Sequence, residues 1–265
     1  MAFFPYRGGK FRIAPQLAGL IPPHKIYVEV FGGAANLLFC KPPSRIEVYN
    51  DANGHLVNLF ETVRNHPLLF LEKCQHLLYS RQLYNAWKDQ LAQDFDGSDV
   101  DSLEAAVRTA YTITSGFTGD PTKGWAFDRS GTGGGTGRWA NIWDRVGYVS
   151  TRLRRVNIDH LDFRKCIEYW DTADTLFFLD PPYYASTSSD FYEFTRQDHQ
   201  DLRTILGKVK GKWMLTYDDE IPIRELYKDF NIRAFSTSLS SEKIENGGTR
   251  TRLAQVLITN FSLDN

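Results

Sequence analysis

Residues 25–36 read KIYVEVFGGAAN, and this stretch decides the predicted fold. The β-branched and aromatic residues from Lys25 to Val30 predict a short strand. The two glycines that follow favour a tight turn, and the apolar residues after Asn36 predict a helix. A strand, a tight turn and a helix in this order form a βα unit, the building block of a parallel α/β sheet.

A second unit of the same kind follows directly. Residues 46–50 predict a strand that ends at Asp51, and the next helix is expected to open near Asn53. Strand-like segments return at residues 156–159, 175–180 and 212–217, with a helix at about 198–209 between the last two. Residues 232–235 and 254–261 are expected to form a closing antiparallel pair. The fold class is therefore α/β, with a mainly parallel sheet and a late antiparallel strand.

The pattern changes between residues 61 and 148. Residues 67–93 are amphipathic and helical in pattern, and a capping box from Asp101 to Glu104 predicts another helix towards Thr114. The glycine-rich residues 131–137 are expected to form no regular element and to be mobile. We therefore predict a mostly helical insertion at 61–148, within a catalytic domain made of residues 1–60 and 149–265.

Composition narrows the class of protein. The 265 residues are 42% hydrophobic, which suits one substantial core with a smaller inserted module. Three widely spaced cysteines and the lack of a signal peptide or long apolar run lead us to expect a soluble, cytoplasmic protein. The histidines show no HxH or HExxH spacing, so no metal is expected, and no Gly-x-Ser-x-Gly elbow is present.

The charge pattern bears on nucleic-acid binding. A net charge of −1 argues against a protein that coats nucleic acid by charge alone, so any DNA contact must depend on a local positive surface. Arginines recur among aromatic residues from position 138 onward, and either a solvated helix face or a phosphate-binding face explains this pattern. We expect DNA contacts from Arg138, Arg145, Arg152 and Arg155.

The strongest chemical motif is Asp180-Pro181-Pro182-Tyr183, directly after an apolar strand. Ligands of open α/β sheets bind at the carboxyl ends of the strands, which is where this motif lies. Two consecutive prolines fix the backbone and remove two donors, so the carbonyl groups of Asp180 and Pro181 remain free to accept hydrogen bonds from a ligand. A simple strand-ending turn is the structural alternative.

The residue types of this motif suit methylation of an aromatic amine. The lone pair of such an amine is delocalised into its ring, and methyl transfer requires that lone pair to point at the methyl carbon. If Asp180 and the Pro181 carbonyl each accept one amino hydrogen, they favour a pyramidal nitrogen and stabilise its developing positive charge. Tyr183 offers a stacking face for a base taken out of the duplex.

Five elements in one order resemble the Dam-like family of DNA adenine-N6 methyltransferases across nearly the whole chain. The resemblance implies a class I methyltransferase fold, with residues 61–148 as a target-recognition module, and strand 255–260 also resembles the family's closing strand. The matching elements are Tyr6-Arg7-Gly8-Gly9-Lys10, Phe31-Gly32-Gly33-Ala34-Ala35, Asp51, residues 61–148 and Asp180-Pro181-Pro182-Tyr183.

The resemblance also implies S-adenosylmethionine as cofactor. Asp51 lies about 20 residues beyond the glycine turn, where an acidic residue binds ribose hydroxyls, although an isolated Asp would be a helix cap. Phe163 is expected to pack on the cofactor's adenine or simply in the core, and Ala35 replaces the family's second glycine. The expected cofactor residues are Tyr6, Lys10, Phe31, Gly32, Gly33, Asp51, Ala52, Asp162, Phe163 and Asp180.

The resemblance implies site-specific adenine-N6 methylation of double-stranded DNA. The expected catalytic residues are Asp180, Pro181, Pro182 and Tyr183. The DNA is expected to lie between the catalytic domain and the insertion. Cytosine N4, an RNA base or a protein amide are alternative substrates, since related motifs serve them. A catalytically idle DNA-binding module is a further alternative. No obligatory protein partner is inferred, and the recognised sequence, biological role and oligomeric state stay open.

Overall fold

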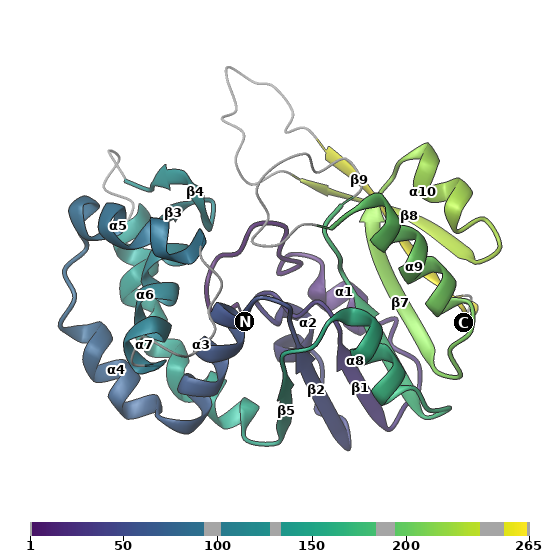
Figure 1. The fold of residues 1–265 in the computed structure, drawn as a ribbon, viewed down its shortest axis with the longest axis horizontal. Coiled ribbons are helices and arrows are strands. Elements are labelled where there is room, and N and C mark those ends of the chain that lie inside the picture. The colour runs from purple at the N-terminus through teal and green to yellow at the C-terminus, as the bar shows by residue number, and fades with distance from the viewer. Residues whose placement is uncertain (1, 93–101, 128–133, 184–193, 239–251, 264–265) are drawn as a thin grey trace.

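The structure is a computed structural model that describes residues 2–92, 102–127, 134–183, 194–238 and 252–263. Figure 1 shows a sheet with helices packed on it and, beside the sheet, a group of helices with a small hairpin. The helical group comes from the middle of the sequence, whereas the sheet is built from segments before and after it.

In the described residues the main sheet has seven strands in the order β5-β2-β1-β6-β7-β9-β8. The first five in this order are parallel, and β9 is antiparallel to both β7 and β8. The predicted mainly parallel sheet with late antiparallel strands is therefore confirmed. The strands are β1 (Ile26–Glu29), β2 (Ile46–Asn50), β5 (Val156–Asp159), β6 (Thr175–Leu179), β7 (Lys212–Asp218), β8 (Asn231–Ser238) and β9 (Arg252–Thr259).

Helices cover both faces of this sheet. The neighbouring side chains Phe177 and Phe178 of β6 pack into two different apolar clusters, one on each face. All five residues of β6 are buried, which explains why this strand is continuously apolar rather than alternating. In Figure 1, α8 and α9 lie in front of the sheet. The helices outside the insertion are α1 (Ala14–Ala18), α2 (Asn36–Cys40), α8 (Phe163–Trp170), α9 (Arg196–Leu206) and α10 (Ile221–Leu226).

The inserted region is mostly helical, as predicted, but it also contains a hairpin that the sequence did not indicate. Helix α3 crosses residue 60 and α7 crosses residue 148, so both run through the proposed domain boundaries. The capping residue Asp101 lies outside the described residues. The elements are α3 (Gly54–Asn65), α4 (Pro67–Gln75), α5 (Arg81–Lys88), the 3₁₀ turn η1 (Asp89–Ala92), α6 (Ser102–Ser115), β3 (Gly116–Phe117), β4 (Asp120–Trp125) and α7 (Gly134–Leu153).

The expectation that residues 131–137 form no regular element was wrong for 134–137, which form the first turn of α7. The cause is a close tertiary contact. A Cβ atom at Gly135 would lie 1.8 Å from the hydroxyl oxygen of Tyr79 and 2.5 Å from the carbonyl oxygen of Ala126. Only glycine allows this approach, so packing outweighs the low helix propensity of glycine. Residues 131–133 lie outside the described residues.

Parallel strands bring their carboxyl ends to one edge of the sheet. The residues that follow β1, β2 and β6, including Gly33, Asp51 and Asp180, therefore lie along a shared edge, which we call the carboxyl edge. Among the residues that the structure describes, no helix is long and apolar enough to cross a membrane. Within the same residues, no group of three or more His, Cys, Asp or Glu side chains could hold a metal ion.

Candidate active site

Asp180 lies at the carboxyl edge, directly after β6, and its carboxylate is held from two sides. The ammonium nitrogen of Lys10 lies 2.6 Å from Oδ1 and 2.7 Å from Oδ2. The hydroxyl group of Thr216, on the neighbouring strand β7, donates a hydrogen bond of 2.7 Å to Oδ1. Lys10 is 6% exposed, so this ion pair is shielded from water and fixes the direction of the carboxylate.

Tyr183 is held by the same lysine and by a residue of β9. Its hydroxyl oxygen accepts hydrogen bonds from the ammonium group of Lys10 and, at 2.7 Å, from the amide nitrogen of Gln255. Burial and the nearby Asp180 raise the pKa of Tyr183 well above its usual value, so the phenol stays neutral. The N-terminal segment, β6 and β9 thus meet at the Asp-Pro-Pro-Tyr motif.

Three polar residues of this site, Thr216, Asp218 and Gln255, were missed by the sequence analysis. Asp218 and Gln255 are cross-strand partners on β7 and β9, and burial raises the pKa of Asp218 above its usual value. Oδ1 of Asp218 is buried without a hydrogen-bond partner among the described residues. The available signal was the presence of Thr216, Asp218 and Gln255 in strands that are otherwise largely apolar.

Asp51 connects the second strand to the glycine turn. Its Oδ2 accepts a hydrogen bond of 2.7 Å from the backbone N–H of Gly33, and its Oδ1 accepts one of 2.8 Å from the N–H of Asn53. Asp51 is 4% exposed, and burial raises its pKa. The residue that caps helix α3 is Asn53, whose side chain accepts from His55 and Leu56. Asp51 therefore shapes the turn and is not the helix cap.

The glycine turn contains one position that is too crowded for a side chain and one position with a left-handed backbone. A Cβ atom at Gly32 would lie 2.2 Å from the ring of Tyr49, whose hydroxyl donates to the Gly33 carbonyl at 3.0 Å. Ala35, which stands in place of the family's second glycine, has a left-handed backbone with φ of 53°. That conformation costs an alanine about 1 to 2 kcal/mol. Ala35 thus adopts a backbone conformation that glycine would adopt without this cost.

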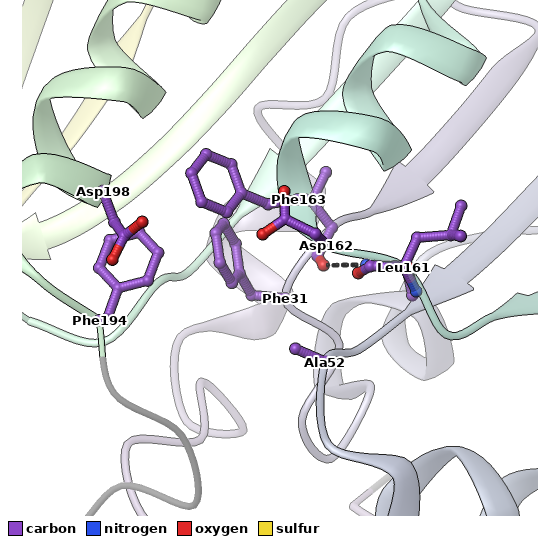
Figure 2. A pocket seen from close by; sticks show the side chains of 9 residues that line it. Phe31, Ala52, Leu161, Asp162, Phe163, Phe194 and Asp198 are labelled. Carbon is purple, nitrogen blue, oxygen red and sulfur yellow. Dashed lines mark hydrogen bonds between the residues drawn. The ribbon is translucent and has the colours of Figure 1, made fainter. Parts of the chain in front are cut away.

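Next to this turn lies a pocket walled by aromatic rings (Figure 2). The rings of Phe31 and Phe163 lie 5.7 Å apart between centroids, and Phe194 lies 5.6 Å and 5.5 Å from them. Phe194 was not predicted, because nothing in its local sequence marks it. The lining residues are Val30, Phe31, Asn50, Ala52, Leu161, Asp162, Phe163, Phe194 and Asp198.

Asp162 was expected to contact the cofactor, and the structure also gives it a structural role. Its side chain caps helix α8 by accepting a hydrogen bond of 2.9 Å from the N–H of Arg164. The guanidinium of Arg164 contacts Asp162 together with Asp198 and Asp201 of α9. This group of charges ties α8 to α9 at the mouth of the aromatic pocket.

The N-terminal segment approaches the glycine turn from the other side. A Cβ atom at Gly33 would lie 3.1 Å from the ring of Tyr6, and one at Gly9 would lie 2.8 Å from the amide nitrogen of Asn36. Oδ1 of Asn36 is buried and has no hydrogen-bond partner among the described residues. Tyr6 therefore lies beside the turn, whereas Lys10 extends past it to Asp180.

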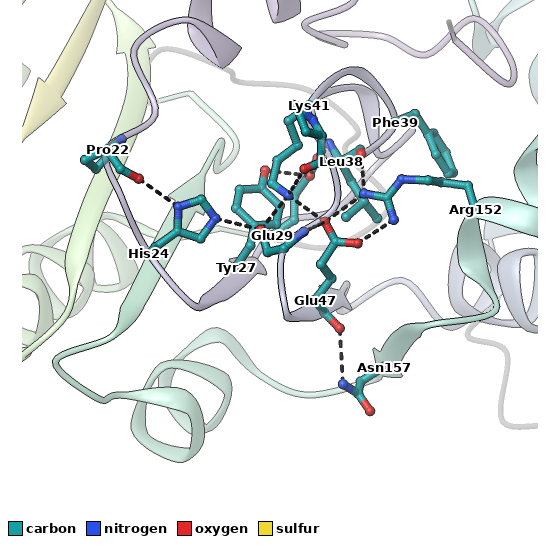
Figure 3. Close-up of polar contacts among 12 residues, drawn as sticks. Pro22, His24, Tyr27, Glu29, Leu38, Phe39, Lys41, Glu47, Arg152 and Asn157 are labelled. Atoms are coloured by element: carbon teal, nitrogen blue, oxygen red, sulfur yellow. Dashed lines mark hydrogen bonds and ion pairs between the residues drawn. The ribbon is translucent and has the colours of Figure 1, made fainter.

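Arg152 was expected to contact DNA, but its guanidinium is occupied in a buried network (Figure 3). It donates to Glu47 Oε1 at 2.7 Å and to the Leu38 carbonyl at 3.0 Å, and Lys41 binds the same carboxylate. Burial acts to raise the pKa of Glu47, but the hydrogen bonds from Arg152 and Lys41 outweigh it and lower the pKa. Removing one partner of such a pair costs about 3 to 5 kcal/mol, so this arginine stabilises the fold.

The other three arginines lie in different places. Arg145 donates hydrogen bonds of 2.9 Å and 3.2 Å to the carbonyl groups of Ala2 and Phe3. Arg155 directly precedes β5, so it lies at the edge of the sheet opposite the carboxyl edge. Arg138 is in the first half of α7, near Tyr79 and the hairpin. The structure therefore does not gather the four arginines into one surface.

The sequence matches the family described as D12 class N6 adenine-specific DNA methyltransferase over residues 6–238. The chain is also similar to the type II methyltransferase M1.LlaDCHI of Lactococcus lactis subsp. cremoris, with 26% identity over 280 residues that cover 98% of this chain and 95% of that protein. It is 26% identical over 247 residues to the DNA N-6-adenine-methyltransferase of Escherichia phage P1. That alignment covers 88% of this chain but 32% of the phage protein.

Proposed function

Because the chain belongs to the D12 class N6 adenine-specific DNA methyltransferases, we propose that residues 180–183 hold the target adenine during transfer of a methyl group to its N6. The position of Lys10 carries this proposal. Its ammonium nitrogen lies within 2.7 Å of both carboxylate oxygens of Asp180 and donates to Tyr183. The space beside Asp180 and Tyr183 therefore holds a nitrogen atom that carries several hydrogens. The N6 amino group of adenine is also a nitrogen that donates more than one hydrogen bond.

The chemistry of the site follows from its acceptors. Asp180 accepts one amino hydrogen of the target and the Pro181 carbonyl accepts the other, which localises the nitrogen lone pair and stabilises the positive charge that develops on it. Pro182 keeps the turn rigid. Tyr183, fixed by Gln255, stacks on the base after it leaves the duplex. Lys10 orients Asp180 until the adenine amine takes its place.

The residues near the glycine turn fit S-adenosylmethionine, the methyl donor of this family. The pocket of Phe31, Phe163 and Phe194 suits the cofactor's adenine ring, and Asp51 keeps lone pairs with which to accept ribose hydroxyls. The Oδ1 atom of Asn36, which has no hydrogen-bond partner among the described residues, suits the ammonium group of the methionine part. When bound, the cofactor supplies a methyl group on a positively charged sulfur.

The decisive experiment measures methyl transfer by the wild type and by two variants, one in the proposed site and one control. Transfer of label from S-adenosylmethionine to duplex DNA, followed by nucleoside analysis, should yield N6-methyladenine. Asp180→Ala should reduce the rate by about 10²-fold or more while cofactor affinity is retained, because the charge that develops on the amine loses its acceptor. Asp174→Ala is the control, since Asp174 is exposed at the opposite end of the same strand. Transfer by Asp180→Ala at the wild-type rate would contradict the proposed site.

Residues 61–148 are proposed to select the DNA sequence in double-stranded DNA. Support comes from the β3–β4 hairpin, which packs on α5 and α6 and lies, with α5, at the upper end of the helical group in Figure 1, the end to which the carboxyl edge of the sheet also points. A chimera that carries the insertion of another family member should methylate that member's site, as read by sequencing of methylated DNA. Methylation of the original site by the chimera would refute this role.

A further inference from the structure

The turn between β3 and β4 lies against the backbone of the N-terminal segment. Gly119, in this turn, has a φ of 77°, and a Cβ atom there would lie 2.5 Å from the Pro5 carbonyl oxygen and 2.8 Å from the Tyr6 nitrogen. Beside this contact, the carboxylate of Asp120, which is 3% exposed, lies 3.3 Å from the guanidinium of Arg7. The close backbone contact keeps the two segments from moving closer, and the ion pair between Arg7 and Asp120 opposes their separation, so the position of one segment depends on that of the other.

The hairpin is in turn attached to the helices of the insertion. The hydroxyl group of Tyr84, on α5, donates to the Pro121 carbonyl, and that of Tyr79 donates to the Ala126 carbonyl. Phe117 and Phe127 are about half exposed on the same hairpin region. A movement of these helices, or the binding of a ligand to the hairpin, is therefore transmitted to the turn between β3 and β4.

The same N-terminal segment also reaches the proposed active site. Within five residues it places the Tyr6 ring on Gly33, the Gly9 backbone beside Asn36 and the Lys10 ammonium group on Asp180 and Tyr183. One face of residues 5–10 thus contacts the hairpin, and the other contacts both the cofactor turn and the catalytic carboxylate.

We propose that Gly119, Asp120 and Arg7 are positioning residues that couple DNA binding at the hairpin to cofactor binding at the glycine turn. DNA that holds the hairpin in this position also holds residues 5–10, and thereby keeps the Tyr6 ring beside Gly33, in the arrangement that the cofactor needs. By linkage, the cofactor then tightens DNA binding by the same factor. This inference rests on the proposed role of residues 61–148 in DNA recognition.

The test measures a coupling factor, which is the factor by which bound duplex lowers the dissociation constant of the cofactor product. The dissociation constant of S-adenosylhomocysteine is determined with and without a saturating duplex that contains the methylated site found by sequencing. For the wild type we expect the duplex to lower it by about five-fold or more, the lower end of common coupling factors. Gly119→Ala and Arg7→Gln should reduce this factor to less than about two-fold.

Two control variants lie on the same hairpin. Gly124→Ala places alanine at a φ of 89°, as unfavourable as at Gly119, but its Cβ atom meets nothing within 4 Å. Lys123→Gln also removes one positive charge, but from an exposed side chain outside residues 5–10. Both should keep the wild-type coupling factor. Thermal unfolding of each variant checks its fold, and Arg7→Gln remains informative if Gly119→Ala does not fold.

The outcomes separate this inference from the proposed function. If Arg7 only bound a phosphate, Arg7→Gln would weaken DNA binding equally with and without cofactor, and the coupling factor would not change. An unchanged factor in Arg7→Gln and in folded Gly119→Ala would overturn the inference, as would a wild-type factor near one. Absence of methyl transfer to DNA by the wild type would instead refute the function.

Discussion

Gln255 lies far from the Asp-Pro-Pro-Tyr motif in sequence, but its side chain supports Tyr183 of that motif. Its amide nitrogen lies 2.7 Å from the Tyr183 hydroxyl oxygen, and its side chain is buried on β9. A tyrosine that stacks on a flipped base must keep its ring in one orientation, since a misplaced base misaligns the amine with the methyl group. Gln255 is therefore a positioning residue for Tyr183.

Gln255→Ala should lower kcat by about five-fold, the cost of one hydrogen bond of about 1 kcal/mol, with little change in cofactor affinity. Gln200→Ala, an exposed glutamine on α9, is the control. If Gln255 acts through the hydroxyl, its loss should have no further effect in a Tyr183→Phe background. Additive losses in the double variant would show that Gln255 acts in another way.

At the scale of elements, β1 and α2 are joined by a buried carboxylate. Oε2 of Glu29, on β1, accepts hydrogen bonds of 2.9 Å from the Tyr27 hydroxyl and from the backbone N–H of Leu38 (Figure 3). Burial raises the pKa of Glu29 to about 8, so the folded protein keeps this group protonated at neutral pH. In the unfolded chain the same group titrates near 4.5.

The sign of the resulting pH dependence follows from proton binding. Between pH 4.5 and about 8 the folded state holds a proton that the unfolded state has lost, so the contribution of Glu29 to stability falls as pH rises. Each pH unit in this window costs at most about 1.4 kcal/mol. Glu29→Gln keeps an acceptor for both hydrogen bonds and does not titrate.

Urea unfolding at pH 5, 6, 7 and 8 should therefore show the wild type losing stability relative to Glu29→Gln as pH rises. Other titrating groups contribute to both proteins, so the difference between them reports on Glu29. A constant difference across this range would mean that Glu29 has an ordinary pKa in the folded state.

At the scale of the whole molecule, the formal charge of −1 requires that DNA attraction be local. Arg138 and Arg155 provide a comparison, because α7 carries the first near the hairpin while the second precedes β5 at the opposite edge of the sheet. Arg145 and Arg152 bind groups within the protein, so their removal would also disturb the fold.

Arg138→Ala should weaken DNA binding and reduce the magnitude of the salt slope by about 1 if it contacts a phosphate. Arg155→Ala should bind like the wild type, since a duplex at the carboxyl edge does not reach it. Titrations at several salt concentrations on cognate and scrambled duplexes measure both effects. A larger loss for Arg155→Ala than for Arg138→Ala would place the DNA elsewhere.

The sequence by itself determined the strands of the main sheet, the glycine turn and the Asp-Pro-Pro-Tyr motif at residues 180–183. These features depend on local physics: β-branched runs favour strands, glycines permit tight turns, and two prolines fix a rigid, acceptor-rich turn. The helix cap at Asn53 and the buried strand β6 could be found in the same way. Family resemblance then gave the order of these elements its functional meaning.

Only the tertiary structure decided which distant residues meet. Lys10 lies on Asp180 across 170 residues, Gln255 fixes Tyr183 across 72, and Arg152 neutralises Glu47 across 105. Gly135 is helical because Tyr79 and Ala126 leave no room for a side chain there. Such contacts depend on how whole elements pack against each other, and a pattern of neighbouring residues carries no information about that packing.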